Sequence, residues 1–289
     1  MTELHTIQSI VDLERIEHNL FRGRSPATSW QRVFGGQVIA QALVATQRTV
    51  DAGRFVHSLH GYFMLPGDPS IPIIYDVERL RDGGSFTTRR VTAIQHGKAI
   101  FSLESSFQSD EPGLEHQAPI PLDVPGPDEV LGQAEILERY GDRIHPEVAR
   151  WWQRERPIEI KPVIIEHFTS REKLAPTQHN WLRFRETVAE DRATRAALLA
   201  YLSDMTLLDT STFAHGRAVF DHDLQTASLD HAMWFHRDHP LDDWILFTQD
   251  SPWTGGARGF NRGALYSRDG MLIASIAQEG LIRVRTKHK

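Results

Sequence analysis

This chain of 289 residues contains an internal repeat, which limits the folds open to it. An offset of 173 residues superposes the turn glycines Gly97 and Gly270, and it also brings Arg89 onto Arg262, Ile100 onto Ile273 and Ser102 onto Ser275. Near Gly97, Ala99, Phe101 and Leu103 alternate with Ile100, Ser102 and Glu104 at the period of a strand, and Asp269-Gly270 is a strong hairpin-turn signal, so both copies are predicted to be β-hairpins. Upstream, His60-Gly61-Tyr62-Phe63 aligns with His231-Ala232-Met233-Trp234 at an offset of 171. The chain is therefore predicted to consist of two related halves.

Each half also begins with a predicted helix that is apolar on nearly all sides. The first covers 37–45 and follows the helix breaker Gly35-Gly36, and the second covers 195–208. A helix of this kind is typical of a buried position, wrapped by a sheet. Each half is thus predicted to be one buried helix followed by several antiparallel strands, which is an α+β arrangement.

A proline-rich stretch separates the two halves. Between residues 108 and 132 the chain contains Pro112, Pro119, Pro121, Pro125 and Pro127. This density of proline prevents a continuous helix or an interior strand. Helical patterns follow at 131–140 and 146–153. We therefore predict an N-terminal domain over 1–110, a linker with short helices over 111–155 and a C-terminal domain over 156–289.

Composition narrows the classes of function. Hydrophobic residues at 40%, charged residues at 24% and a mean hydropathy of −0.38 are typical of a soluble globular protein. The net charge of −6 argues against nucleic acid as the main partner, because such binding depends on clustered Lys and Arg. The absence of cysteine removes disulfides, thiolate metal sites and a cysteine nucleophile. The sequence shows no signal peptide, membrane span or peroxisomal address, so the cytoplasm is the expected compartment.

Asp204 is the most informative single residue. On a helix, its neighbours three and four positions away are all apolar: Ala200, Tyr201, Leu207 and Leu208. Burying an ionised carboxylate is costly unless it is paired or hydrogen-bonded. An acid at this position therefore indicates a function or a specific structural partner. A functional acid and a structural acid satisfied by an arginine or by backbone groups explain the pattern equally well. The first helix has no Asp or Glu between residues 35 and 50, so the repeated unit does not require this acid.

A second cluster of polar residues lies over 226–237. Ser228, Asp230 and His231 suggest a nucleophilic triad, but on a strand Asp230 and His231 would point to opposite faces. The chain also lacks the G-x-S-x-G turn that exposes a nucleophilic serine. His231 and His236 lack the spacing of metal ligands, and we expect no metal site. A packed, hydrogen-bonded histidine is the favoured interpretation of His231.

Gln278 ends a run of apolar residues that alternate along the last predicted strand, so its amide is expected to face the interior. Most glutamines in such positions only bond to backbone groups. The sequence contains no Walker A loop and no HExxH motif, and 255–259 lacks the spacing of a dinucleotide-binding turn. Four arginines, Arg258, Arg262, Arg283 and Arg285, give the second half a local basic character suited to ligand phosphates.

Several short motifs together resemble the acyl-CoA thioesterase II family over almost the whole chain. They are Phe34-Gly35-Gly36-Gln37, Leu65-Pro66-Gly67-Asp68, Ser203-Asp204, the block from Ser228-Leu229-Asp230-His231 to Trp234-Phe235-His236-Arg237, Ala257-Arg258-Gly259 and Gln278-Glu279-Gly280. The resemblance implies a double hot-dog fold, in which two tandem helix-wrapped antiparallel β-sheets form a pseudo-dimer. It also implies hydrolysis of fatty acyl-CoA thioesters to free fatty acid and CoA without a cofactor. The catalytic Asp, Ser or Thr, and Gln of the family fall on Asp204, Ser228 and Gln278.

With this trio, we expect Asp204 to act as general base on a water that the Ser228 hydroxyl and the Gln278 amide also hold. The pattern leaves open whether water or a transient acyl-enzyme is involved. Backbone N–H groups at Gly35 and Gly36 are expected to stabilise the oxyanion, because glycine permits close approach and the helix dipole favours negative charge there. Since only the second helix carries an acid, we expect one active site per chain.

Arg258, Arg262 and His231 are further candidates for binding the substrate. Two other functions fit the same resemblance. One is a noncatalytic acyl-CoA sensor or carrier. The other is a hot-dog enoyl-CoA hydratase, which would need an Asp–His pair, although no histidine lies near Asp204 in its helix. The resemblance also leads us to expect a homodimer or a homotetramer.

Overall fold

The computed structural model of the chain describes residues 6–26, 32–153, 156–188 and 191–285. These residues form two compact units. Unit 1 comprises the described parts of Met1–Gln117, Val188–Met205 and Leu229–Pro240, and unit 2 comprises those of Ala118–Thr187, Thr206–Ser228 and Leu241–Lys289. The chain therefore leaves unit 1 after Met205 and returns to it at Leu229. The boundaries of the compact units do not coincide with those of the predicted domains, 1–110, 111–155 and 156–289. The compact units and the sequence repeats are therefore different divisions of the chain.

Unit 1 is built on an antiparallel sheet. In spatial order its strands are β1 (Glu14–Glu17), β2 (Leu20–Gly23), β4 (Ile73–Asp82), β5 (Phe86–Gln95), β6 (Lys98–Ser109), β3 (Arg54–Phe63) and β10 (Asp230–Phe235). The predicted hairpin at Gly97 is confirmed, because β5 and β6 are joined by His96 and Gly97 with φ angles of 50° and 71°. Positive φ at both turn residues matches the twist of the flanking strands. Strand β10 reaches this sheet from far along the sequence.

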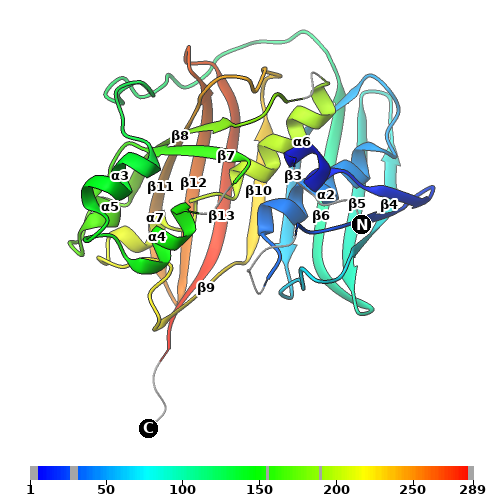
Figure 1. The fold of residues 1–289 in the computed structure, drawn as a ribbon. Coiled ribbons are helices and arrows are strands. Elements are labelled where there is room, and N and C mark those ends of the chain that lie inside the picture. The colour runs from blue at the N-terminus through cyan, green and yellow to red at the C-terminus, as the bar shows by residue number, and fades with distance from the viewer. Residues whose placement is uncertain (1–5, 27–31, 154–155, 189–190, 286–289) are drawn as a thin grey trace. The chain divides into compact units, whose positions relative to one another are not determined.

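The helices of unit 1 are α1 (Ile7–Val11), α2 (Gly35–Gln47) and α6 (Arg192–Ser203). Helix α2 contacts β3, β4, β5 and β6, and it also packs against α6 (Figure 1). The predicted helix over 37–45 is confirmed. The predicted extension of the second helix to Leu208 is wrong, because α6 ends at Ser203. Thr206 then adopts a φ of 63°, which a right-handed helix cannot accommodate.

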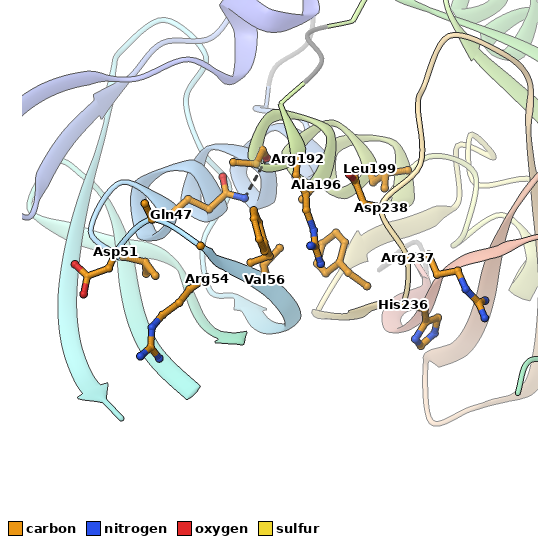
Figure 2. A pocket seen from close by; sticks show the side chains of 16 residues that line it. Gln47, Asp51, Arg54, Val56, Arg192, Ala196, Leu199, His236, Arg237 and Asp238 are labelled. Carbon is orange, nitrogen blue, oxygen red and sulfur yellow. Dashed lines mark hydrogen bonds between the residues drawn. The ribbon is translucent and has the colours of Figure 1, made fainter. Parts of the chain in front are cut away.

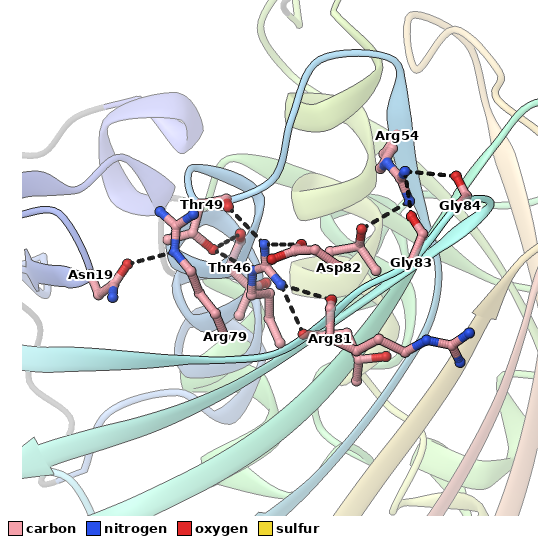
Figure 3. A network of polar contacts seen from close by, with 12 residues as sticks. Asn19, Thr46, Thr49, Arg54, Arg79, Arg81, Asp82, Gly83 and Gly84 are labelled. Carbon is pink, nitrogen blue, oxygen red and sulfur yellow. Dashed lines mark hydrogen bonds and ion pairs between the residues drawn. The ribbon is translucent and has the colours of Figure 1, made fainter.

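A buried arginine on β5 forms hydrogen bonds with the residues that follow α2. The side chain of Arg89 is almost fully buried, and its Nε donates to the Thr49 hydroxyl at 3.0 Å. One Nη2 donates both to the Thr49 carbonyl at 3.1 Å and to Asp82 Oδ1 at 2.6 Å. Figure 3 shows this polar network with Thr49 and Asp82 labelled. Arg89 therefore ties the chain that follows α2 to the end of β4.

Replacing Arg89 with methionine is expected to lower the free energy of unfolding by about 2–3 kcal/mol, because the buried carbonyl and hydroxyl of Thr49 lose their donors. The adjacent Arg90→Met is a matched control. Arg90 is exposed and pairs with Glu78 and Glu104, and ion pairs of this kind contribute less than about 1 kcal/mol. Urea unfolding followed by tryptophan fluorescence measures both variants. Equal losses would contradict the assigned role of Arg89.

The strands of unit 2 also pair antiparallel, and helices lie over one face of them (Figure 1). In spatial order the strands are β7 (Ile158–Pro162), β8 (Thr177–Phe184), β11 (Ile245–Gly255), β12 (Arg258–Ser267), β13 (Leu272–Val284) and β9 (Leu224–Ser228). The helices are α3 (Gln133–Tyr140), α4 (Pro146–Gln153), α5 (Glu166–Thr169) and α7 (Thr210–Phe213). The predicted helices at 131–140 and 146–153 and the second predicted hairpin are confirmed. No helix in the described ranges is long and apolar enough to span a membrane.

The residue-by-residue alignment of the two halves is partly wrong. Arg262 is exposed and pairs with Asp250 on the neighbouring strand, as Arg90 does with Glu78, so Arg90 and not Arg89 is its counterpart. His60 is exposed, whereas His231 is 1% exposed and lies opposite Gly61 in the β3–β10 pair. Because neighbouring strand residues point to opposite faces, an error of one position reverses the predicted environment.

Candidate active site

Asp204 lies at the end of α6 and not within it. It is the C-cap residue, half-buried, and its backbone N–H donates to the carbonyl of Leu202. Its carboxylate reaches the first residue of α2, since a Cβ on Gly35 would lie only 2.6 Å from Oδ2 of Asp204. The two helices approach closely at this point, because a Cβ on Gly36 would lie 2.3 Å from the Tyr201 carbonyl oxygen. The glycine pair thus gives the acid access to the helix N-terminus.

The N-termini of the two packed helices differ. The N-cap of α2 is Phe34, which offers no side-chain cap. The N-cap of α6 is Asp191, whose carboxylate accepts a hydrogen bond from the Thr194 N–H at 2.8 Å. The first N–H groups of a helix have no partner within it, and they attract negative charge. The N-terminus of α2, at the predicted oxyanion residues Gly35 and Gly36, therefore remains the better place for an anionic group.

His231 is buried and bonded to the residue before Asp204. Its Nε2 lies 2.8 Å from Oγ of Ser203, and both side chains are at most 1% exposed. Since the Ser203 hydroxyl donates its one proton to the Ala200 carbonyl at 2.9 Å, Nε2 of His231 must be the donor to Ser203. The interpretation of His231 as a packed, hydrogen-bonded histidine is confirmed. No group of three or more His, Asp or Glu in the described part of the chain is arranged to hold a metal ion.

Ser228 and Gln278 form a hydrogen-bonded pair in unit 2. Nε2 of Gln278 donates to Oγ of Ser228 at 2.7 Å, and the Gln278 side chain is 1% exposed. The pair forms because β9 runs beside β13, with Ser228 opposite Gly280. The inward orientation predicted for Gln278 is therefore confirmed. The strand considered for 226–237 is interrupted at Leu229: β9 ends at Ser228 and pairs with β13, whereas β10 starts at Asp230 and pairs with β3.

The predicted trio is divided between the two compact units. Asp204 belongs to unit 1, and Ser228 and Gln278 belong to unit 2. Two of the three lie at places where the chain passes between units. Asp204 is the residue before Met205, after which the chain enters unit 2. Ser228 is the last residue of unit 2 before the chain returns to unit 1 at Leu229.

The predicted substrate-binding arginines are exposed and paired with acids. Nε of Arg258 donates to Glu279 at 2.9 Å, and Nε of Arg262 donates to Asp250 at 3.0 Å. Hydrogen bonding to Asp250 raises the pKa of Arg262. Any phosphate that binds these guanidinium groups must therefore compete with a carboxylate for them.

A cavity of about 210 Å³ lies in unit 1, where the C-terminal end of α2 meets the N-terminal end of α6 (Figure 2). Its lining includes Gln47, Arg54 and Arg192. Arg192 donates to both carboxylate oxygens of Asp110 at 2.9 Å, and Arg54 donates to the Gly83 and Gly84 carbonyls at 2.7 Å. No member of the predicted trio lines this cavity, so it does not mark the predicted site.

Asp209, a second acid close to Asp204 in sequence, has an unusual environment. Burial raises its pKa from 3.8 to about 7. The folded protein therefore keeps this proton over a pH range in which the unfolded chain releases it, and stability falls as the pH rises from about 4 to about 7. Asp209→Asn removes this loss.

We expect the gain in stability of Asp209→Asn over wild type to be small at acid pH and to grow to at most about 4 kcal/mol near pH 8, at about 1.36 kcal/mol per pKa unit. Urea unfolding at a series of pH values measures the gain. A gain that does not depend on pH would contradict a raised pKa for Asp209.

Sequence reasoning missed three buried amides in unit 2, namely Gln178, Asn180 and Gln249, which are 2%, 1% and 3% exposed. All three donate to Thr206, two residues after Asp204. The sequence contained a signal for the first two. Gln178 and Asn180 lie at alternate positions of one strand, on the same inward face as Leu182. Buried polar side chains on such a face require partners.

The fold defines the general class of this protein. A structure from Alicyclobacillus acidocaldarius described as having the hot dog fold matches with a TM-score of 0.78, over 96% of this chain and 98% of that chain, at 18% identity. A likeness at this identity concerns the fold alone. The protein is thus an α+β protein of the hot-dog class.

Closer relatives define the family. An acyl-CoA thioesterase II structure from Mycobacterium marinum matches with a TM-score of 0.81 and 39% identity, over 98% of this chain and all of that one. Human acyl-coenzyme A thioesterase 8 is 40% identical over 96% of this chain and 89% of its own length. Acyl-CoA thioesterase 2 from Haemophilus influenzae is 36% identical over 97% and 98%. Family models described as acyl-CoA thioesterase N-terminal domain and acyl-CoA thioesterase match residues 24–108 and 150–281. The chain belongs to the acyl-CoA thioesterase family, a family of thioester hydrolases.

Proposed function

We propose that the protein hydrolyses fatty acyl-CoA thioesters to free fatty acid and CoA, with a water activated by Asp204. Membership of the thioesterase family supports the reaction. The observation that carries the mechanism is the Asp204 carboxylate against Gly35, at the N-terminus of α2 that no side chain caps. A thioester needs a base to activate water and donors for the developing oxyanion, and this end of the helix pair offers both.

In the proposed first step, Asp204 accepts a proton from water while the water oxygen attacks the thioester carbonyl carbon. Ser228 and Gln278 hold the same water. The bond from Gln278 to Ser228 supports this role, because it holds the two polar side chains together in one fixed arrangement. A burst of thiol in the first turnover would instead indicate a transient acyl-enzyme on Ser228.

In the proposed second step, the tetrahedral intermediate carries its negative charge on the former carbonyl oxygen. The N–H groups of Gly35 and Gly36 stabilise this charge, and the dipole of α2 adds to their effect. The C–S bond then breaks, and the CoA thiolate takes the proton that Asp204 received. Asp204 returns to its ionised state, and the products are the fatty acid and free CoA.

We further propose that the finer architecture is a double hot-dog pseudo-dimer with one active site per chain. The C-terminal end of α2 carries Gln47 and Arg48, where α6 carries Ser203 and Asp204. The N-terminus of α6 is capped by the Asp191 carboxylate, which would repel an oxyanion. At the end of the helix pair remote from Asp204, α2 therefore has no acid in the position that Asp204 has on α6, and a carboxylate already caps the N-terminus of α6.

Release of free thiol from acyl-CoAs of graded chain length tests the proposed function. Steady release by the wild-type protein supports it. Loss of enoyl absorbance without thiol release would indicate an enoyl-CoA hydratase, and binding without either reaction would indicate a sensor or carrier. Each of these two results would overturn the proposal.

The remaining proposals concern the surroundings of the reaction. Arg258 and Arg262 are proposed to attract the CoA phosphates, in competition with their acidic partners. His231 was a candidate for substrate contact, and its burial favours a supporting role. Cytoplasmic location and assembly as a homodimer or homotetramer stay predictions.

A further inference from the structure

The backbone between α6 and α7 is strained next to Asp204. Among the described residues, those other than glycine with positive φ are His96, Thr206 and Ala257, at 50°, 63° and 61°. His96 and Ala257 lie in the tight turns of the β5–β6 and β11–β12 hairpins, where positive φ is ordinary. Thr206 lies in no hairpin, and its branched side chain makes this conformation costly. Such strain persists only where the surroundings enforce it, and it is concentrated at functional sites.

Three buried amides enforce the conformation of Thr206 within unit 2. Gln178 donates to the Thr206 carbonyl at 2.8 Å. Gln249 and Asn180 donate to the Thr206 hydroxyl at 2.8 Å and 3.3 Å. Gln178 and Gln249 face each other across the β8–β11 pair and are bonded at 2.6 Å, so the cluster is anchored to two strands. The carbonyl and the hydroxyl of Thr206 are therefore both fixed.

A second anchor holds the chain on the other side of Asp204, within unit 1. Ser203 is fully buried and its hydroxyl accepts from Nε2 of His231 at 2.8 Å. His231 is itself placed by the pairing of β10 with β3, opposite Gly61. A Cβ on Gly61 would lie 2.5 Å from the ring of Phe101, so this strand has little room to shift. The residue before Asp204 is thus tied to a sheet.

A purely structural role explains these contacts less well. Glycine at position 206 would adopt positive φ without strain, and it would not require hydroxyl partners. The C-cap residues Arg48 of α2 and Asp204 of α6 are both right-handed, but Val50, which follows Arg48 as Thr206 follows Asp204, does not have a positive φ. The strained backbone at Thr206 and the buried amides that bind it are thus found after α6, the helix whose C-cap is Asp204, and not after α2.

We propose that Ser203 with His231, and Thr206 with Gln178, Asn180 and Gln249, clamp the backbone on both sides of Asp204 and so set the direction of its carboxylate. These are positioning residues, because they act through Asp204 and not on the substrate. The proposal rests on the proposed function, in which Asp204 is the general base. A base must lie within hydrogen-bond reach of the water it activates, and a displacement of about 1 Å can cost about 100-fold in rate.

Single substitutions that release either anchor test the clamp. Gln249→Leu removes a donor to Thr206, and Ser203→Ala removes the partner of His231. Each is expected to lower kcat for acyl-CoA hydrolysis by about 10–100-fold, with KM within about twofold of wild type, because substrate contacts are untouched. Gln41→Leu and Ser105→Ala are matched controls, since they remove equally buried hydrogen-bonding side chains remote from the end of α6. The controls are expected to lower the thermal midpoint and to keep kcat.

Position 206 provides a rescue test. Thr206→Ser keeps the hydroxyl and is expected to keep kcat. Thr206→Gly favours the same φ but loses the hydroxyl, so it is expected to lower kcat even if the protein is as stable as wild type. Wild-type kcat in Gln249→Leu, Ser203→Ala and Thr206→Gly, or losses that only follow the thermal midpoint as in the controls, would overturn the clamp.

The outcomes separate the clamp from the proposed function. If the wild-type protein releases no thiol, or if Asp204→Asn keeps full activity, the proposed function or the role of Asp204 is wrong. If wild type is active, Asp204→Asn is inactive and the anchor variants keep their kcat, only the clamp is wrong.

Discussion

Asp204→Asn is expected to lower kcat for palmitoyl-CoA by about 10²–10⁴-fold, which is the usual contribution of a general base, and to leave the thermal midpoint near that of wild type. An amide has nearly the shape of a carboxylate but cannot accept the proton of the attacking water. The fold should tolerate the change, because Asp204 caps α6 through its backbone N–H bond to Leu202, which the substitution leaves in place. Thiol release and thermal unfolding of the purified variant measure the two effects.

Asp209→Asn is the matched control for this prediction. It is the same substitution five positions further along the chain, at an acid with a raised pKa that has no part in the proposed reaction. We expect Asp209→Asn to keep the wild-type kcat. Undiminished hydrolysis in Asp204→Asn, or equal losses in the two variants, would show that Asp204 is not the base.

Local patterns predicted most of the secondary structure. The hairpins at Gly97 and Gly270 and the helices at 131–140 and 146–153 depend on residues close in sequence, and all four are confirmed. The end of α6 was not predictable in this way. Its apolar pattern continues through Leu207, whereas the chain is turned out of the helix at Thr206. That conformation is held by amides on β8 and β11, which lie far away in the sequence.

The candidate site was predictable to different degrees. The burial cost of a carboxylate singled out Asp204 without knowledge of the fold, although its position as a C-cap and its approach to Gly35 depend on how two helices pack. The bond between Ser228 and Gln278 depends on the pairing of β9 with β13, which no local pattern specifies. The roles of the trio came from the resemblance. The environment of His231 was predicted by its sequence neighbours, because alternation along β10 places it inward.

Gly36→Ala is expected to cause the largest loss of stability among single substitutions at the helix pair. The new Cβ would lie 2.3 Å from the Tyr201 carbonyl oxygen and 2.6 Å from the ring of Phe34. A backbone oxygen cannot rotate away as a side chain can, so α2 and α6 must move apart. Overpacking usually costs about 1–3 kcal/mol, and we expect a loss of about 3 kcal/mol or more because the obstacle is backbone. Thermal and urea unfolding measure it.

Substitutions at Gly84 and Gly35 distinguish an effect on the stability of the helix pair from an effect on the proposed reaction. A Cβ on Gly84 meets nothing within 4 Å, so Gly84→Ala should leave both stability and activity near wild type. A Cβ on Gly35 meets mainly the Asp204 carboxylate at 2.6 Å, which can swing aside. Gly35→Ala should therefore cost less stability than Gly36→Ala and still lower kcat about 100-fold or more, because it displaces the base. If Gly36→Ala were as stable as Gly84→Ala, the close packing of α2 on α6 would be wrong, and the approach of Asp204 to the helix N-terminus would lose its structural basis.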